Sequence, residues 1–166
     1  MSTIKFTLFT LTILAFLNTN VKAQAPISRA QNVFVELGGP GLLVSANYDT
    51  RFTQKRDGIG GRLGAGYMSV DNSSLFTLPL QANYLLGKEG KYFEIGLGAT
   101  YINLGDDDDD DFLSFDSSSS LIGTMTFGYR YQPETSGFSF RASINPIFNK
   151  SGFIPYFAGI SLGYAF

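Results

Sequence analysis

Apolar side chains alternate with small or polar ones along nearly the whole sequence beyond residue 31. A period of two is that of a β-strand, whose successive side chains point to opposite faces, and no long stretch has the 3.6-residue period of an amphipathic helix. The sequence therefore predicts an all-β protein. The alternation divides into eight segments, at 32–38, 42–52, 58–68, 75–86, 91–102, 121–131, 137–148 and 154–166.

The segments and their connections have lengths typical of a membrane barrel. Each segment spans roughly 7 to 13 residues, close to the 9–11 that a tilted strand needs to cross a bilayer. Short polar connections at 53–57, 87–90 and 132–136 alternate with others, of which 103–120 is the longest. This pattern predicts an eight-stranded antiparallel up-and-down transmembrane β-barrel, with both chain ends on the side of the short turns.

Two prolines lie inside the predicted strands. Pro79 falls within the segment 75–86, and Pro146 within 137–148. Proline cannot donate a hydrogen bond to a neighbouring strand, and a closed barrel has no free edge to accommodate it. We therefore expect each proline to mark a β-bulge.

Alternation alone leaves open which face of the barrel points outward. A soluble lipocalin-type binding barrel in the periplasm also has eight strands, but its apolar face points inward. Three features favour a membrane barrel: small residues crowd the polar face, as a narrow lumen requires, aromatic residues gather near segment ends, and the chain finishes on an alternating strand. We therefore expect outer-membrane lipids to surround the apolar face.

The first 23 residues have the features of a secretory signal peptide. Lys5 precedes an apolar run of about a dozen residues, and small side chains follow up to Ala23. The run is too short for a membrane-spanning helix, which needs about 20 apolar residues. We predict cleavage after Ala23, a short periplasmic tail at 24–31, and an outer-membrane β-barrel at 32–166.

The composition excludes several classes of function. The chain has no cysteine and no histidine, so disulfides, lipid anchoring on cysteine and thiolate sites are excluded, and the usual nucleophile activators are missing. We predict no enzymatic activity, no cofactor and no metal centre. Loss of Lys5 and Lys22 with the signal peptide makes the net charge −4, and this acidic balance argues against binding nucleic acid.

The terminal stretch IPYFAGISLGYAF places Tyr164 and Phe166 on an alternating final strand. This ending resembles the assembly signal of outer-membrane proteins, which implies recognition by the barrel-assembly machinery during biogenesis. With VFVELGGPG, TLPLQANYLLGKEGKYFEIGLGATY and GTMTFGYRYQPETSGFSFRASINPIF, it is similar to the small eight-stranded OmpA/OmpX-like barrels, especially those of Bacteroidota. These patterns are architectural, so the resemblance implies a fold and a location rather than an activity.

The polar face carries seven charged residues that a barrel would enclose. Enclosed charges must pair or stay hydrated, because desolvating an unpaired charge is costly. We predict a charge network that plugs the lumen, with Glu94 and Arg130 as a pair because they lie at similar heights on neighbouring segments. The alternative is a charged constriction in a narrow pore. The seven residues are Glu36, Asp49, Arg51, Arg62, Glu94, Arg130 and Arg141.

The connection 103–120 contains a run of acidic residues. Clustered carboxylates suit hard cations such as Ca²⁺, but the spacing is not that of an EF-hand, so a solvated surface loop is the main prediction and weak cation binding the alternative. Phe112, Leu113 and Phe115 follow the run, which makes the loop a candidate site for an extracellular partner. The acidic residues are Asp106, Asp107, Asp108, Asp109, Asp110, Asp111 and Asp116.

The function most consistent with these features is that of a small integral outer-membrane barrel. Its role would be structural, in envelope integrity, or one of surface interaction. A narrow pore for ions or small solutes is the first alternative. A soluble periplasmic binding barrel is the second.

Overall fold

The computed structural model describes residues 29–70, 73–106, 119–150 and 152–166. Most of these residues lie in β-strands, which confirms the predicted all-β class. Among them, no helix has the length and hydropathy needed to cross a membrane. The elements are β1 (Gln31–Gly38), η1 (Gly39–Gly41), β2 (Val44–Arg51), β3 (Gly58–Val70), β4 (Ser73–Lys88), β5 (Lys91–Asp106), β6 (Ser119–Tyr131), β7 (Gly137–Ile144), β8 (Ile147–Asn149), β9 (Gly152–Ile154) and β10 (Ala158–Ala165).

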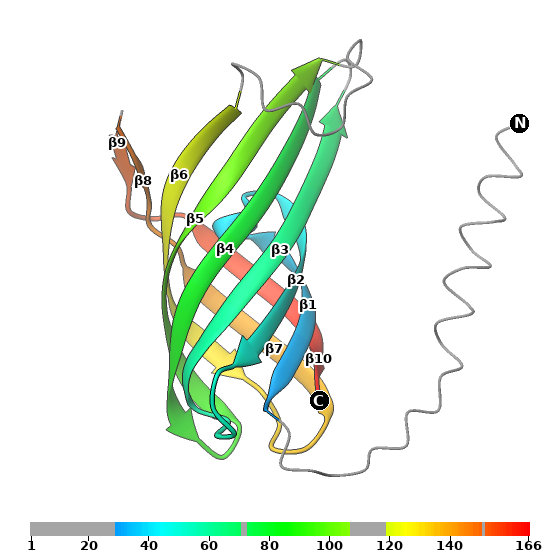
Figure 1. Cartoon of the computed structure of the whole chain (residues 1–166), viewed down its shortest axis with the longest axis vertical. Helices are drawn as coiled ribbons and strands as arrows, with labels where there is room; N and C mark the ends of the chain where they lie inside the picture. The colour runs from blue at the N-terminus through cyan, green and yellow to red at the C-terminus, as the bar shows by residue number, and fades with distance from the viewer. Residues whose placement is uncertain (1–28, 71–72, 107–118, 151) are drawn as a thin grey trace, which may run out of the picture.

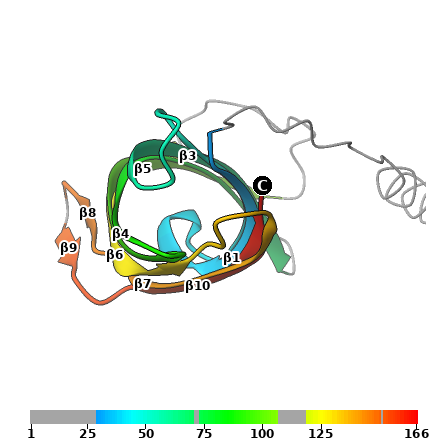
Figure 2. The ribbon, with the colours of Figure 1, turned by 90° about the horizontal axis from the view of Figure 1, so that it is seen from below.

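The strands form one closed antiparallel barrel (Figures 1 and 2). Consecutive strands pair from β1 to β7, β7 pairs with β10, and β10 pairs with β1 to close the ring. The short strands β8 and β9 continue the course of β7 and lead into β10, so the ring is eight-stranded. We call each of these eight positions around the ring a wall of the barrel. The predicted eight-stranded up-and-down barrel is confirmed.

Short turns and both ends of the barrel domain lie at one end of the barrel, which we call the turn end (Figure 1). The tightest of these turns joins β4 to β5 through Glu89 and Gly90, with φ of 57° and 77°. Two consecutive positive φ angles are typical of the type I′ hairpin, whose twist matches that of the flanking strands. At the opposite end, the loop end, β3 to β6 extend beyond the other strands.

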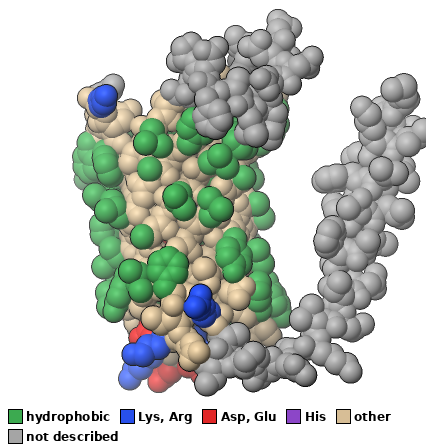
Figure 3. Space-filling view, viewed as in Figure 1, with side chains coloured by type: hydrophobic (Ala, Val, Ile, Leu, Met, Phe, Trp, Pro, Cys, Tyr) green, Lys and Arg blue, Asp and Glu red, His purple; other side chains and the backbone are tan. Residues whose placement is uncertain are grey.

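The barrel wall is apolar outside and polar inside. On β1, the side chains of Asn32 and Glu36 are buried in the lumen, whereas those of Val33 and Val35 are exposed on the outer wall. The other strands repeat this alternation, and hydrophobic side chains cover the wall in Figure 3, with charged groups gathered at its ends. The lipocalin-type alternative, with its apolar face inward, is therefore wrong for this chain.

The prolines interrupt the strand pairing without inserting a residue. The register between β3 and β4 is the same on both sides of Pro79, and the register of β6 with β7 and then β8 is the same on both sides of Pro146. The prediction that these two prolines mark bulges is therefore wrong. Each proline omits one ladder hydrogen bond, and the neighbouring pairs keep the strands aligned.

The bulge lies instead beside Pro155. Between the pairs Ile144–Ala158 and Ile147–Ile154, the three residues 155–157 oppose the two residues 145–146. An extra residue on one strand bends that strand. The hairpin of β8 and β9 accordingly leans outside the ring (Figure 2).

Several predicted features lie outside the described residues. These are the signal peptide 1–23, most of the tail 24–31, and the acidic loop from residue 107 to residue 118. The described part of the predicted connection 103–120 belongs to the ends of β5 and β6.

Candidate functional site in the barrel lumen

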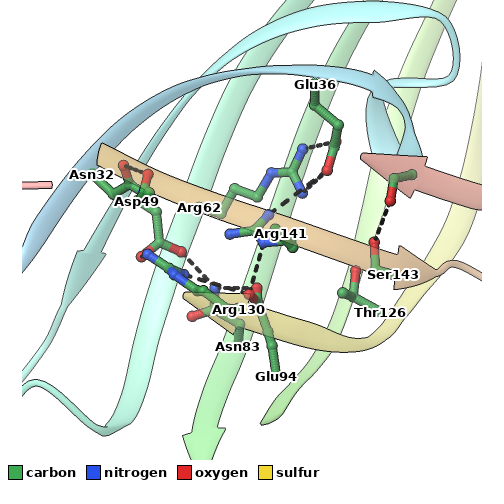
Figure 4. A network of polar contacts seen from close by, with 12 residues as sticks. Asn32, Glu36, Asp49, Arg62, Asn83, Glu94, Thr126, Arg130, Arg141 and Ser143 are labelled. Atoms are coloured by element: carbon green, nitrogen blue, oxygen red, sulfur yellow. Dashed lines mark hydrogen bonds and ion pairs between the residues drawn. The ribbon is translucent and has the colours of Figure 1, made fainter. Parts of the chain in front are cut away.

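Seven charged side chains are buried inside the barrel, and six of them are labelled in Figure 4. They come from β1, β2, β3, β5, β6 and β7, and each is at most 2% exposed. Ion pairs link them in one continuous series, in which each member contacts the next within 4.0 Å. We call this set the lumen network, in the order Arg51, Asp49, Arg130, Glu94, Arg141, Glu36 and Arg62.

Asp49 holds two arginines from different walls of the barrel. Its Oδ1 lies 2.7 Å from Nη2 of Arg51 and 2.9 Å from Nη2 of Arg130. Asn83 donates to the other oxygen, Oδ2, at 2.5 Å. Arg51 also donates through Nη1 to the carbonyl of Gly58, at 2.9 Å, which fixes the guanidinium beside the turn between β2 and β3. The carboxylate of Asp49 is thus fully enclosed by donors.

Glu94 connects Arg130, which is bound to Asp49, to Arg141 and the rest of the network. The predicted pair, Glu94 with Arg130, has an Oε2–Nη1 distance of 3.5 Å, but both residues make shorter contacts elsewhere. Arg141 Nε lies 2.8 Å from Glu94 Oε2, and Asn83 donates to Glu94 Oε1 at 3.0 Å. The register explains this, because Arg130 is opposite Tyr92, which lies two residues nearer the turn end than Glu94. From there Arg130 contacts Asp49.

Glu36 forms the second anchor of the network. Arg62 donates to it through both terminal nitrogens, Nη1 to Oε1 at 3.2 Å and Nη2 to Oε2. Asn47 accepts from Arg62 Nε at 3.0 Å, so the guanidinium is held on two sides. A bidentate arginine–carboxylate contact is the strongest geometry of this kind, since two parallel hydrogen bonds add to the charge attraction.

Three uncharged residues belong to the site but were not predicted from the sequence, which pointed to charged side chains only. Asn47 and Asn83 hold the arginines, and the ring of Phe34 lies 4.5 Å from Cζ of Arg141 and 4.9 Å from Cζ of Arg62. Strand parity was an available signal, because all three share the inward face with the charges. The aromatic character of Phe34 hid its position, since most large aromatic residues of the strands are exposed on the outer wall.

A layer of neutral polar side chains lies next to the charges. Thr126 bonds with Gln81 Oε1 and with Asn145 Oδ1, at 3.0 Å each, and Asn145 donates to Ser143 Oγ at 2.9 Å. These four residues come from three different walls of the barrel and are buried, and they hydrogen-bond to one another, although Gln81 Nε2 has no partner among the described residues. The layer continues the filling of the lumen toward the loop end.

The connection between β1 and β2 folds into the barrel. Its short 3-10 helix, η1, is buried and lies inside the ring in Figure 2. Thr100 donates to the carbonyl of Pro40 at 2.6 Å, and Thr77 donates to the carbonyl of Gly41 at 3.0 Å. Positive φ angles at Gly38 and Gly39 turn the chain inward, a conformation that glycine adopts readily. We call η1 the inner turn.

Glycines on the inner face are packed rather than facing open space. A Cβ on Gly39 would meet the Glu36 carboxyl group, one on Gly64 would meet Asn47 Oδ1, and one on Gly96 would lie 2.7 Å from Gln81 Oε1. Interiors filled to this density leave no room for an added methyl group. The lumen at these positions is therefore occupied by side chains.

Comparison with known proteins identifies the fold. No protein-family model matches the chain, and no curated protein matches it. Among solved structures, it is similar to the N-terminal β-barrel domain of Pseudomonas aeruginosa OprF, with a TM-score of 0.56, 17% identity, and coverage of 86% of this chain and 100% of that one. This is the fold of small outer-membrane barrels.

A second solved structure has the same barrel fold. The Yersinia pestis outer membrane protein Ail, determined in a phospholipid bilayer nanodisc, matches with a TM-score of 0.51 and 12% identity, over 84% of this chain and 99% of that one. The OmpA/OmpX-like resemblance noted in the sequence is therefore confirmed at the level of the fold.

In this outer-membrane barrel fold, the final residue lies at the closing seam. The amide of Gln31 donates to the carbonyl of Phe166 at 3.0 Å, and the amide of Phe166 donates back at 2.9 Å. Tyr164 is the cross-strand partner of Phe138 on β7, and its ring is exposed on the outer wall. Tyr164 and Phe166 thus both lie near the turn end, next to the last strand pair of the ring.

The acidic run cannot be placed, apart from Asp106 at the end of β5, because residues 107–118 lie outside the described residues. Within the described ranges, no three His, Cys, Asp or Glu side chains are grouped so that they could hold a metal ion. Weak cation binding and a surface partner at 103–120 both stay predictions. Equilibrium dialysis against calcium would test the first of them.

Proposed function

We propose that this protein is an integral outer-membrane barrel with a sealed lumen, and that it serves the envelope as a structural element. The observation that carries the membrane location is the outer wall, where large apolar side chains such as Leu63, Leu80 and Leu97 are more than half exposed. Contact with water would be unfavourable by about 25 cal/mol for each Å² of this surface. Lipid chains remove that cost.

The sealed lumen is supported by three successive layers. The lumen network, the neutral layer around Gln81 and the inner turn each draw side chains from several walls of the barrel. An eight-stranded barrel has an interior just wide enough for its own side chains. A structural role therefore fits this interior better than the conduction of solutes.

Conductance in planar bilayers tests the sealed lumen. We expect no steady channels from the refolded barrel, because ion pairs and the inner turn would have to separate before ions could pass. Insertion must be verified separately, by a shift in gel mobility between unboiled and boiled samples, which a closed membrane barrel shows and an unfolded chain does not. The absence of this shift would contradict the proposed membrane location.

A narrow pore is the alternative outcome of the same experiment. It would show steady channels whose conductance changes in the Arg130→Gln variant, since Arg130 spans the lumen to Asp49. Such channels would contradict the sealed lumen but leave the outer-membrane location intact.

We also propose that the terminal strand is read by the barrel-assembly machinery. Support comes from β10, which carries an exposed apolar face and ends in Phe166 at the seam with β1. In cells, Phe166→Ser should reduce the heat-modifiable, membrane-inserted fraction several-fold. The matched control is Phe153→Ser on the β8–β9 hairpin, also an exposed phenylalanine but at the loop end. Equal assembly of both variants would contradict the proposal.

A further inference from the structure

The lumen network contains one more arginine than carboxylates. Among the described residues, the buried charged side chains are four arginines, one aspartate and two glutamates. Arginine keeps its proton in proteins, and a carboxylate between arginines stays ionised. The described residues inside the barrel therefore carry a net charge of +1. An uncompensated buried charge is strongly unfavourable.

Arg141 is the arginine of the network whose guanidinium makes the fewest hydrogen bonds, although it lies near two carboxylates. Arg51 and Arg130 hydrogen-bond to Asp49, and Arg62 holds Glu36 through two nitrogens. Arg141 Nε lies 2.8 Å from Glu94 Oε2, but its N–H does not point at that oxygen, and Nη1 is 3.7 Å from Glu36 Oε1. None of the three guanidinium nitrogens makes a hydrogen bond to a described residue.

Two other cations lie close to Arg141. Arg130 is its direct cross-strand partner on β6, and both side chains point into the lumen. Like charges in directly opposite positions destabilise a strand pair. Arg62 and Arg141 both contact the ring of Phe34, whose centroid is 4.5 Å from Arg141 Cζ and 4.9 Å from Arg62 Cζ. Excess positive charge is thus concentrated around one guanidinium.

We propose that the lumen binds one small monovalent anion, such as chloride, against the guanidinium of Arg141. Free N–H donors, a side chain only 2% exposed and neighbouring cations give the anion both hydrogen bonds and charge attraction. Water could satisfy the same donors but would leave the excess charge in place. The site depends on the closed barrel and not on the proposed structural role.

Anion-dependent stability tests this site. The barrel, in uncharged detergent micelles, is unfolded with urea while chloride is replaced by gluconate at constant ionic strength. Gluconate is a much larger anion than chloride and serves as the non-binding reference, so we expect the unfolding midpoint to rise with chloride and to saturate, as one-site binding to the folded state requires. Crystals grown with bromide should show one anomalous peak beside Arg141. Equal midpoints in the two salts, or a lumen without bromide, would overturn the proposal.

Two variants separate an anion site from general salt effects. Arg141→Gln removes the excess charge and should abolish the chloride dependence. Ser161→Asp places a carboxylate on the direct cross-strand partner of Arg141 on β10, and it should abolish the dependence while keeping all four arginines. This second variant keeps the test decisive if the first does not fold.

The control variant is Arg56→Gln. Arg56 donates to the carbonyl of Pro133 between two turns at the turn end, outside the network. Its chloride dependence should match that of the native barrel. A Ser161→Asp barrel that folds and still responds to chloride would contradict a site at Arg141.

Discussion

At the scale of single residues, the lumen is organised by carboxylates that each hold more than one arginine. Asp49 contacts Arg51 and Arg130, and Glu94 contacts Arg130 and Arg141, so a guanidinium on one wall is tied to carboxylates on others. Arginine suits this role because its planar fork offers five donors in fixed directions, whereas lysine offers a single charged point. Removing one carboxylate therefore disturbs two walls of the barrel.

The variant Asp49→Asn tests the importance of this sharing. It keeps the shape of the side chain but leaves two buried arginines without their shared carboxylate, and breaking a buried pair costs about 3–5 kcal/mol. We expect a loss of that size in the free energy of unfolding, measured with urea in lipid vesicles. The control is Asp57→Asn in the turn between β2 and β3, where the effect should stay within about 0.5 kcal/mol. Equal effects would show that the network adds little.

At the scale of elements, the inner turn decides how the lumen is filled. Leu42 has a φ of 73° and Gly39 one of 63°, so the chain enters and leaves this turn through left-handed conformations. The conformation is held by hydrogen bonds from Thr77 and Thr100 to the carbonyls of η1. The five-residue connection 39–43 thus places η1 within the lumen, although its length alone would also fit a solvent-exposed hairpin.

The variant Gly39→Ala tests the inner turn. Its new methyl group would meet the Glu36 carboxyl group in a backbone conformation that alanine disfavours. We expect a loss of about 1–3 kcal/mol in the free energy of unfolding, the usual cost of a strained backbone position. Gly152→Ala is the matched control, because a Cβ there has no atom within 4 Å. If both substitutions cost the same, the inner turn is not packed as described.

At the scale of the whole molecule, the barrel is inverted relative to a soluble protein. Polar side chains are buried in its interior, and the exposed aromatic pairs Phe93–Tyr129 and Phe138–Tyr164 lie on the outer wall toward the turn end. Aromatic rings in such a band are typical of the membrane–water interface. The same wall in water would promote aggregation, because it is a continuous apolar surface.

The variant Leu97→Lys tests this inversion. Leu97 lies in the middle of β5 on the outer wall and is 57% exposed, so a lysine there would project into the hydrocarbon. We expect a cost of about 2–4 kcal/mol for folding into lipid vesicles, the cost of a cation near the bilayer midplane. Gln54→Lys, in an exposed turn, should be close to neutral. A neutral Leu97→Lys would contradict the proposed membrane contact.

The sequence by itself determined the strands, their number and which side chains share a face. A period of two indicates a β-strand, and strand parity placed residues such as Glu36, Arg62 and Glu94 on one polar face of the barrel wall. The bulges predicted at Pro79 and Pro146 were wrong, because the register passes through both prolines unchanged.

The tertiary structure alone decided the partners inside the lumen. Strand parity predicts which side chains share a face. Contact across the barrel depends on the tilt of the strands and on the stagger between strands that are far apart in the sequence. This is why Arg130 lies nearer to Asp49 than to the predicted Glu94, and why Phe34 meets two arginines. The inward fold of η1 likewise depends on hydrogen-bond donors from β4 and β5, Thr77 and Thr100, which no local pattern encodes.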